Sequence, residues 1–379
     1  GITAMNGAWK SWWRRFGADG LAVDPGALRI MKLVFVYWGF ENAGSMLDLK
    51  GYARAAEAAG HEVTVYGPPG HVFALDYSKD LSNVDAVVFV VEWTTELQFG
   101  DRLDWLRLVS AVPRRRRVVI DCDGGYNDPI AFHGDYNHTT AEKSRAWVDI
   151  CDSIADKICQ PTLKPERPNV IPFLFHIYDP AWETPLDFSG KEFGMIYVGH
   201  TKFRWRGMSQ VLRGIEPIRD RIGRIGLVGE GWDAPLEWTE WQEIRDDYFV
   251  DRDYLKKLGV EALAAVSYNK VIATMSRGIF NPVIYRPLFE RLAFVTCRTF
   301  ETPASGTIPL FLLDTDYVRG IYGAEAEALA LGQQPEVKIL DVVSRPQHYA
   351  EIVMGIREEF RKRHSPAARL KNLIDIIES

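Results

Sequence analysis

The sequence has no hydrophobic run long enough to cross a membrane, because no stretch approaches the roughly 18 to 20 apolar residues that a spanning helix needs. It has little cysteine, and Cys122, Cys151, Cys159 and Cys297 follow no paired metal spacing. Such scattered cysteines fit a reducing compartment.

Basic residues are not in excess either, since the net charge is -6, and nucleic-acid binding needs a basic surface. We therefore expect a cytoplasmic protein without a transmembrane segment. A nucleic-acid partner is disfavoured, although a local basic patch would allow one.

The 379 residues are too many for one ordinary core and suit two domains. Hydrophobic residues make up 47% and charged residues 25%, as in globular proteins. Residues 1–30 stand apart, because tryptophans alternate there with Lys10, Arg14 and Arg15 and no uninterrupted apolar stretch marks a secretory signal. We interpret residues 1–30 as an N-terminal extension packed on the protein's own surface. The alternative is a helix at a membrane interface, which would make the protein peripheral to a membrane.

Residues 31–180 alternate between short apolar runs rich in β-formers and amphipathic stretches. Gly60 closes the first amphipathic stretch, as a glycine commonly does at the end of a helix. This alternation predicts a doubly wound parallel sheet in an N-terminal Rossmann-like domain. The predicted elements are strands at 32–37, 61–66, 86–91 and 117–120 and helices at 46–59 and 101–112.

Prolines crowd into residues 160–191, and we interpret this stretch as the connection between two domains. A second alternating pattern follows and predicts a C-terminal Rossmann-like domain at 191–350. C-terminal helices at 351–379 could cross back to the first domain. Two such domains facing each other form a cleft at the carboxyl ends of their strands. In the second pattern we predict strands at 193–198, 225–228 and 271–273, a helix at 208–213 and helical structure from 346 to 379.

A loop rich in cations follows the first strand of the second pattern. The strand ends at Gly199 and His200, and a helix begins shortly after Arg206. Backbone N–H groups and the positive end of a helix attract a diphosphate, and arginine adds a fork of donors. The residues that we expect to bind the ligand here are Gly199, His200, Lys202, Arg204 and Arg206, with Gly229 in the next glycine turn.

This spacing resembles that of glycosyl transferase group 1 proteins of the GT-B fold, in which a Gly-Arg pair is followed by Lys-Gly. Gly199-His200 and Arg206-Gly207 stand at the matching positions. The resemblance implies an α/β fold of two Rossmann-like doubly wound parallel-sheet domains facing a cleft. It also implies that Arg206 contacts the diphosphate of a nucleotide sugar. Because His200 replaces an arginine, the second phosphate contact falls to Lys202 or Arg204.

The strongest match is the stretch from Arg298 to Gly306. The resemblance implies that Glu301, followed by Thr302, binds the ribose hydroxyls of the nucleotide, a task that suits a carboxylate. A helix-capping role is the structural alternative. The family's other glutamate is replaced by Ala293. The Arg-x-Phe-Glu run at 298–301, with the segments 268–275 and 364–369, is similar to the spore-maturation (CgeB-like) glycosyltransferases, and this similarity implies that Arg298 faces the donor.

The first half is expected to supply the acceptor site and the catalytic base. Carboxylates at strand ends face the cleft and could take a proton from an acceptor hydroxyl. Asp123 is our first choice, ahead of Asp121 and Glu92. Gly39, Asn42 and Gly44 lie in the first strand-to-helix loop, which lacks a full Gly-x-Gly-x-x-Gly motif and predicts a nucleotide contact only weakly.

The Asp121-x-Asp123 pair allows two other interpretations. It resembles the metal-binding signature of single-domain (GT-A) glycosyltransferases, and, with Gly124, the nucleophile motif of haloacid-dehalogenase-type phosphatases. Loop histidines at 133, 138 and 176 could bind the acceptor or act as a base, although such histidines more often bond to backbone. The arginines at 114–117 suit a solvated turn, with an anionic acceptor as the minority interpretation.

These patterns together predict a metal-independent glycosyltransferase that moves a hexose-type sugar from a nucleoside-diphosphate sugar to an acceptor hydroxyl. We expect no cofactor besides that donor substrate and no metal ligands. The resemblance slightly favours retention of the anomeric configuration. The alternative from another class is a non-catalytic nucleotide-sugar-binding partner subunit. The acceptor is left open among glycan, lipid, small molecule, protein and modified nucleic acid, because acceptor sites of this fold lie on loops.

Overall fold

The structure is a computed structural model, and its chain divides into residues 1–30 and residues 31–379. Several positions singled out above lie outside the described residues: Gly39, Asn42, Gly44, His133, His138 and residues 1–28 of the N-terminal extension. All that follows concerns the second unit. The residues that the structure describes are 29–37, 45–67, 75–92, 105–128, 131–132, 135–136, 141–236 and 249–379.

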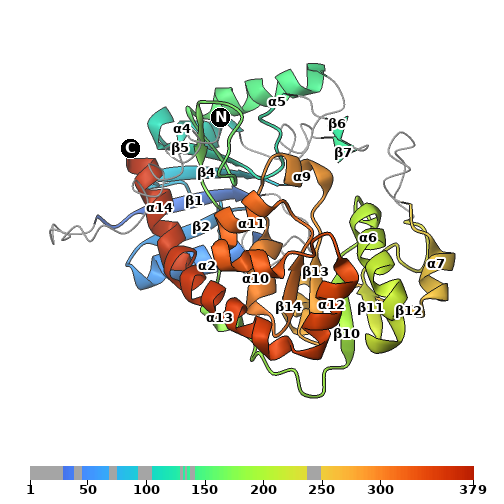
Figure 1. The fold of residues 1–379 in the computed structure, drawn as a ribbon. Helices are drawn as coiled ribbons and strands as arrows, with labels where there is room; N and C mark the ends of the chain where they lie inside the picture. Colours follow the sequence, from blue (N-terminus) through green and yellow to red (C-terminus); the bar gives the residue numbers. More distant parts are fainter. Residues whose placement is uncertain are drawn as a thin grey trace, which may run out of the picture. The chain divides into compact units, whose positions relative to one another are not determined.

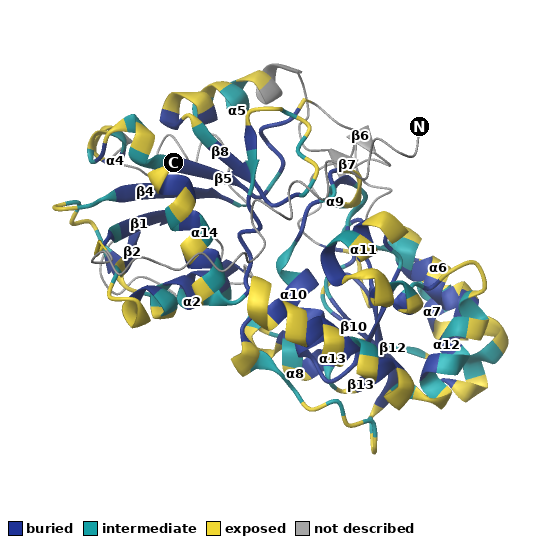
Figure 2. Cartoon of the chain, turned by 60° about the vertical axis from the view of Figure 1, so that its left-hand side comes forward, coloured by how far each residue is buried: buried dark blue, intermediate teal, exposed yellow. Residues whose placement is uncertain are grey.

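The first sheet is parallel throughout and has the strand order β3-β2-β1-β4-β5-β8-β9 (Figure 1). Its central strand β4 is buried at every position, which explains why its sequence is apolar without alternation. Figure 2 shows the same burial along the neighbouring strands. The strands are β1 (Lys32–Tyr37), β2 (Glu62–Tyr66), β3 (Tyr77–Ser78), β4 (Ala86–Val91), β5 (Arg117–Asp121), β8 (Lys157–Gln160) and β9 (Val170–Pro172). The helices are α2 (Ser45–Ala58), α4 (Trp105–Ser110) and α5 (Ala141–Ile154), and β6 (Ala131–Phe132) pairs with β7 (Asp135–Tyr136) in a small antiparallel ribbon.

The second sheet is also parallel, in the order β12-β11-β10-β13-β14. The prediction of two doubly wound parallel sheets is therefore confirmed. The strands are β10 (Phe193–Val198), β11 (Ile225–Val228), β12 (Val260–Leu263), β13 (Gly278–Val283) and β14 (Ile308–Phe311). The helices are α6 (Trp205–Ile215), α7 (Arg252–Lys257), α8 (Val271–Met275), α9 (Pro287–Arg291), α10 (Cys297–Ala304), α11 (Thr315–Tyr322) and α12 (Pro335–Ser344).

The predicted strand at 271–273 is wrong, because these residues open the helix α8. Val271, Thr274 and Met275 are the buried residues of α8, and their spacing of three and four places them on one helix face. Burial of that face against the second sheet outweighs the β-propensity of the Val271-Ile272 pair. Three strands of the second sheet are missing from the prediction: β12, β14 and β13, the last of which begins only a few residues after α8.

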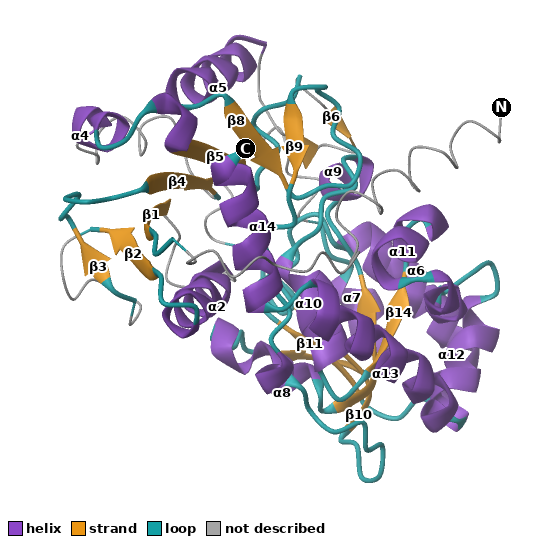
Figure 3. Ribbon diagram, turned by 90° about the vertical axis from the view of Figure 1, so that its left-hand side faces the viewer, coloured by secondary structure: helices purple, strands orange, loops and turns teal. Residues whose placement is uncertain are grey.

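Within the described residues, the chain passes between the two sheets twice. After β9, residues 173–178 alternate between cores: Phe173, Phe175 and Ile177 pack into the core of the first sheet, and Leu174 and Tyr178 into that of the second. The second passage joins α13 (Pro346–Arg363) to α14 (Pro366–Glu378), which packs against α2 (Figures 1 and 3). The two passages meet where Tyr178 N donates to His364 O at 2.7 Å.

The residues at 364–369, part of the spore-maturation-like pattern, lie at this second passage. His364 packs against Phe300 at a ring-centroid distance of 5.0 Å, and its ring nitrogen bonds to the buried Arg369 guanidinium. Ser365 caps α14 by accepting a hydrogen bond from Ala368 N. These residues therefore support the fold next to α10.

Within the described residues, no helix is both long and apolar enough to span a bilayer.

Candidate functional site

A cavity of about 400 Å³ lies at the carboxyl ends of both sheets. This is where ligands bind in doubly wound folds, because the strand-to-helix loops converge there. Residues from both halves line it. The first half contributes Glu92, Cys122, Asp123 and His176. From the second half, the cavity lining includes the predicted residues Gly199, His200, Arg204, Gly229, Arg298, Glu301 and Thr302.

Two backbone segments come together at one wall of this cavity and require a glycine. Gly229 has a φ of 149°, and a Cβ added to it would lie 2.2 Å from the carbonyl oxygen of Gly199. That same oxygen accepts a hydrogen bond from Trp232 Nε1 at 2.8 Å, so it cannot easily move away. Gly229 is therefore needed for the close approach of the loops after β10 and β11.

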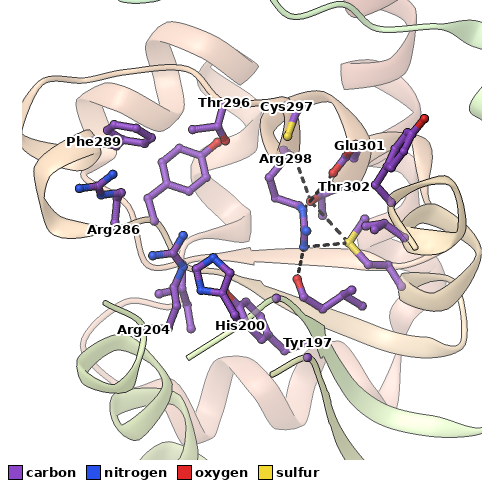
Figure 4. Close-up of a pocket in the computed structure, with 18 of the residues that line it drawn as sticks. Tyr197, His200, Arg204, Arg286, Phe289, Thr296, Cys297, Arg298, Glu301 and Thr302 are labelled. Atoms are coloured by element: carbon purple, nitrogen blue, oxygen red, sulfur yellow. Dashed lines mark hydrogen bonds and ion pairs between the residues drawn. The ribbon is translucent and has the colours of Figure 1, made fainter. Parts of the chain in front are cut away.

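Two arginines at the cavity come from different strand ends (Figure 4). Arg204 immediately precedes α6, and its Nη1 donates to the Lys202 carbonyl at 3.1 Å. Arg286 immediately precedes α9, and its guanidinium lies 5.0 Å from the ring centroid of Phe203 and 4.7 Å from that of Phe289. Packing between two aromatic rings holds Arg286 in place at the cavity.

The pKa of His200 reflects the positive charge of this part of the cavity wall. Burial, followed by the neighbouring cations with Arg204 first, lowers the pKa of His200 to about 3. The imidazole is therefore neutral at physiological pH. Its buried Nδ1 has no hydrogen-bond partner within the described part of the chain. A neutral polar group among several cations suits a bound anion.

Two of the predicted phosphate ligands lie elsewhere. Arg206 is exposed on the first turn of α6 and is not part of the described cavity lining. Lys202 is also outside that lining, with its ammonium 5.0 Å from the ring centroid of Phe203. Arg286, which the sequence reasoning missed, occupies the cavity instead. The available signal was its position just beyond a strand, followed by Pro287 at the start of a helix.

The N-terminal end of α10 faces the cavity with Thr296, Cys297 and Arg298 (Figure 4). Thr296 begins the helix through a capping box with Thr299. Arg298 Nε donates to Glu301 Oε2 at 3.1 Å, and Arg298 Nη1 donates to the Val198 carbonyl. Burial raises the pKa of Glu301, and Arg298 opposes this rise. Glu301 therefore does not act as a helix cap; it forms an ion pair inside the cavity wall.

The other end of α10 is held by a buried arginine from α13. Arg357 Nε donates to the Pro303 carbonyl at 2.7 Å, and Arg357 Nη2 donates to the Ala304 and Ser305 carbonyls at 3.2 and 3.1 Å. A cation at the C-terminal carbonyls complements the helix dipole. Both ends of this short helix are thus fixed by side-chain hydrogen bonds.

Asp121 and Asp123 have different environments. Asp121 accepts hydrogen bonds from the backbone N–H groups of Asp123, Gly125 and Tyr126 at 3.2, 3.1 and 2.8 Å. Gln160 Nε2 also donates to Asp121 Oδ2 at 2.8 Å. Four donors occupy a buried carboxylate that does not reach the cavity, so the catalytic role considered for Asp121 is not supported. Asp123 does line the cavity.

Glu92, the third predicted carboxylate, follows β4 and lines the cavity. Its Oε2 accepts hydrogen bonds from the Ser45 hydroxyl and, at 3.4 Å, from the Tyr37 hydroxyl. Burial raises the pKa of Glu92, while His176 opposes this rise. His176 lines the same wall, and its Nδ1 lies 2.6 Å from Asp48 Oδ2.

The arginines at 114–116 precede β5 and Arg117 begins it, so all four lie at the opposite end of the strand from the cavity. Arg114 Nε bonds to Asp156 at 2.8 Å, and Arg116 Nη1 bonds to Glu378 at 2.6 Å. Their ion pairs are structural, and the minority interpretation of an acceptor site at this run is not supported.

Among the described residues there is no group of three or more His, Cys, Asp or Glu side chains placed to hold a metal ion.

No protein-family model matches the chain, and no curated protein matches it. Solved structures do match. A mutant of T4 phage BGT in complex with UDP-glucose is 14% identical, with a TM-score of 0.52, and the match covers 92% of this chain and 100% of that one. An alpha-glucosyltransferase in complex with UDP and a 13-mer DNA containing an HMU base is 14% identical, with a TM-score of 0.58 and coverage of 93% and 100%. Residues 31–379 thus adopt the GT-B glycosyltransferase fold. The Asp-x-Asp interpretation as a GT-A enzyme is wrong, because a GT-A enzyme has a different fold.

Proposed function

We propose that the protein is a glycosyltransferase that moves a hexose from a nucleoside-diphosphate sugar to an acceptor hydroxyl. One observation carries the proposal: a single cavity at the strand ends of a GT-B fold combines a cationic wall with carboxylates from both halves. The cations match a diphosphate, and the carboxylates match hydroxyl groups of a sugar, a ribose and an acceptor. Similar structures that contain UDP or UDP-glucose support this choice of donor.

The second half would hold the donor. Arg204, Arg286 and the N-terminal end of α10 surround the space in which a diphosphate fits. Glu301 is the candidate for the ribose hydroxyls. Val266, Tyr268, Val271 and Met275 line an apolar part of the cavity and suit a nucleobase. The cationic wall would stabilise the charge that develops on the departing nucleoside diphosphate, which is often the largest contribution to catalysis.

The first half would supply the base. Glu92 is favoured over Asp123, because two hydroxyl groups fix its carboxylate and burial keeps it away from bulk water. In the transfer, the acceptor hydroxyl gives its proton to Glu92, and its oxygen forms the new bond to the anomeric carbon. The bond from that carbon to the diphosphate breaks, and its electron pair leaves on the nucleoside diphosphate. We propose that no metal is required, since arginines supply the positive charge.

The acceptor and the closer subfamily belong to the proposal as well. Some similar structures contain DNA, one of them with an HMU base, so a DNA carrying a hydroxymethyl pyrimidine is a natural first acceptor to test. The spore-maturation (CgeB-like) assignment rests on the Arg-x-Phe-Glu run at 298–301. Arg298 and Glu301 bond to each other, which supports a shared role for the run in the donor site.

A thermal-shift panel of nucleoside diphosphates and nucleotide sugars, followed by turnover assays, tests the proposal. A binding donor raises the melting temperature, because it binds only the folded state. Release of nucleoside diphosphate in the presence of water, sugars or hydroxymethylated DNA then shows transfer or hydrolysis. Lack of stabilisation by every nucleotide would contradict the donor site.

A non-catalytic nucleotide-sugar-binding subunit is the second candidate. It is favoured by the Arg298–Glu301 ion pair, in which the two predicted donor residues bond to each other. Stabilisation by a nucleotide sugar without any turnover, across the acceptor panel, would support this candidate.

A further inference from the structure

A buried histidine–aspartate pair lies at the first-sheet side of the cavity and has no part in the donor site. His176 and Asp48 are 5% and 1% exposed. His176 Nδ1 lies 2.6 Å from Asp48 Oδ2, and the other carboxylate oxygen accepts a hydrogen bond from Ile177 N at 3.0 Å. Asp48 therefore fixes the imidazole through Nδ1 while His176 lines the cavity.

The second part of this cluster is Glu92, on the same wall. The hydroxyls of Ser45 and Tyr37 both donate to Glu92 Oε2. Ser45 and Asp48 lie one turn apart on α2, Tyr37 ends β1, and Glu92 follows β4. Glu92 and His176 are thus each bonded to a side chain of α2, on neighbouring turns, and both line the cavity.

The charges around His176 decide its protonation. Burial by itself lowers the pKa of His176, but the carboxylates of Asp48, Glu92 and Glu301 together outweigh burial and raise it. The carboxylates belong to α2, to the end of β4 and to α10. A raised pKa keeps a larger share of the imidazole protonated and unable to accept a proton from an acceptor hydroxyl, which favours the Glu92 carboxylate as the base of this cluster.

The groups around Glu92 shift its pKa in both directions. Burial raises the pKa of Glu92, and His176 is the strongest group opposing that rise; Ser45 and Tyr37 also lower it, whereas Asp48 raises it. Cys122, at the end of β5, faces the same carboxylate. Arg298 partly neutralises Glu301, the only carboxylate of the cluster from the second half.

We propose that His176, fixed by Asp48, is a positioning residue that keeps the Glu92 carboxylate ionised at the acceptor side of the cavity. This inference rests on the proposed function, because it concerns the base of that transfer. His176 does not take the proton itself. Its positive charge offsets the cost of burying Glu92, so that Glu92 can accept the proton of the acceptor hydroxyl near neutral pH.

The variants H176Q and D48N test the proposal, with H348Q as matched control, because His348 is exposed and far along the chain on α13. The rate of UDP-glucose turnover, with water as acceptor, is measured from acid to alkaline pH. We expect H176Q to move the acid limb to higher pH by about one unit, with the alkaline plateau within about threefold of wild type. D48N should give a smaller shift, because it weakens the charge on His176 and also removes a carboxylate that itself raises the pKa of Glu92. The control keeps the wild-type profile.

Two results would overturn the proposal. An unshifted acid limb in H176Q means that His176 does not act on Glu92. A loss of more than about a hundredfold at every pH, without a shift, identifies His176 itself as the proton acceptor. If H176Q fails to fold by circular dichroism, H176N replaces it in this assay and in the following measurement.

Histidine labelled with ¹⁵N gives a test that needs no turnover. The sequence has eight histidines, and the signal lost in H176Q identifies His176. We expect the His176 ring to remain protonated beyond neutral pH and its titration midpoint to fall in E92Q. A midpoint unaffected by E92Q contradicts the proposal even if the enzyme is active. A wild-type protein that turns over no nucleotide sugar, but shows this coupling, contradicts the proposed function instead.

Discussion

Arg298 and Glu301 form an ion pair of 3.1 Å between Nε and Oε2, one turn apart on α10 and inside the wall of the cavity. A nucleotide that binds Glu301 through its ribose must therefore share this carboxylate with Arg298 or displace it. The pair is largely buried, and removing one partner of a buried pair leaves the other uncompensated.

We expect Glu301→Gln to weaken UDP binding by about tenfold, since a neutral amide accepts hydroxyl protons less strongly than a carboxylate. Isothermal titration calorimetry measures the affinity. Glu351→Gln, at an exposed position of α13, is the control and should leave the affinity unchanged. An E301Q affinity equal to that of wild type would remove Glu301 from the donor site.

Arg286→Ala is expected to weaken binding of UDP by about ten- to a hundredfold, because a charge-assisted hydrogen bond to a phosphate contributes about 1.5–3 kcal/mol. Arg206→Ala should leave the affinity unchanged, since Arg206 lies outside the described cavity lining. The family resemblance alone predicts the reverse order. Calorimetry on the two variants decides between the resemblance and the geometry.

Glu92→Gln is expected to lower turnover by about a hundredfold or more, the usual contribution of a general base. The affinity for UDP should stay as in wild type, because Glu92 belongs to the first half. Asp123→Asn, on the same cavity, should retain most of the activity. If the two variants exchange these effects in a steady-state assay, Asp123 is the base.

Asp121→Asn should destabilise the protein by about 2 kcal/mol, because the amide presents donors to three backbone N–H groups and the Gln160 side-chain amide, which are donors already. Urea unfolding gives the free energy. Glu92→Gln serves as comparison, since its effect should fall on turnover and not on stability. A fully stable D121N protein without activity would restore a catalytic role for Asp121.

Gly229→Ala is expected to cost about 2–3 kcal/mol of unfolding free energy, because its φ is unfavourable for alanine and the new Cβ meets the Gly199 carbonyl. Gly355→Ala in α13 is the control, since nothing lies within 4 Å of its added Cβ. That control should gain up to about 1 kcal/mol through helix propensity. Equal stability of the two variants, measured in urea, would mean that the loops after β10 and β11 can separate.

Local patterns sufficed for much of the fold. Continuous apolar runs such as β4 identify strands buried on both faces, and Gly60 marks the end of α2. The same reasoning missed β9, because Pro172 at its end resembles a linker. It also misplaced residues 271–273, where packing of one helix face overrides propensity. Local preference thus predicts elements well where burial is uniform.

The site was harder to predict, because its partners are far apart in the sequence. Asp48 and His176 are separated by 128 residues, and no pattern links them. Asp121 and Asp123 are indistinguishable by type and spacing, yet one is occupied by backbone donors and the other lines the cavity. Glu301 and Arg298 were proposed because both lie in one short run, whereas Arg286 is held between Phe289 of α9 and Phe203, which is distant in the sequence.

The hydrogen bond from Tyr178 N to the His364 carbonyl joins the only two points at which the described chain passes from one sheet to the other. The halves are also joined beside α9, where Val295 N donates to the Pro161 carbonyl at 2.7 Å and the Thr162 hydroxyl donates to the Leu292 carbonyl at 3.0 Å. A relative rotation of the two halves must therefore keep or break both sets of bonds. A disulfide or bulky residue introduced beside the Tyr178–His364 bond would restrict opening without touching the cavity. Release of the product would then slow, whereas the intrinsic affinity for the donor would not change.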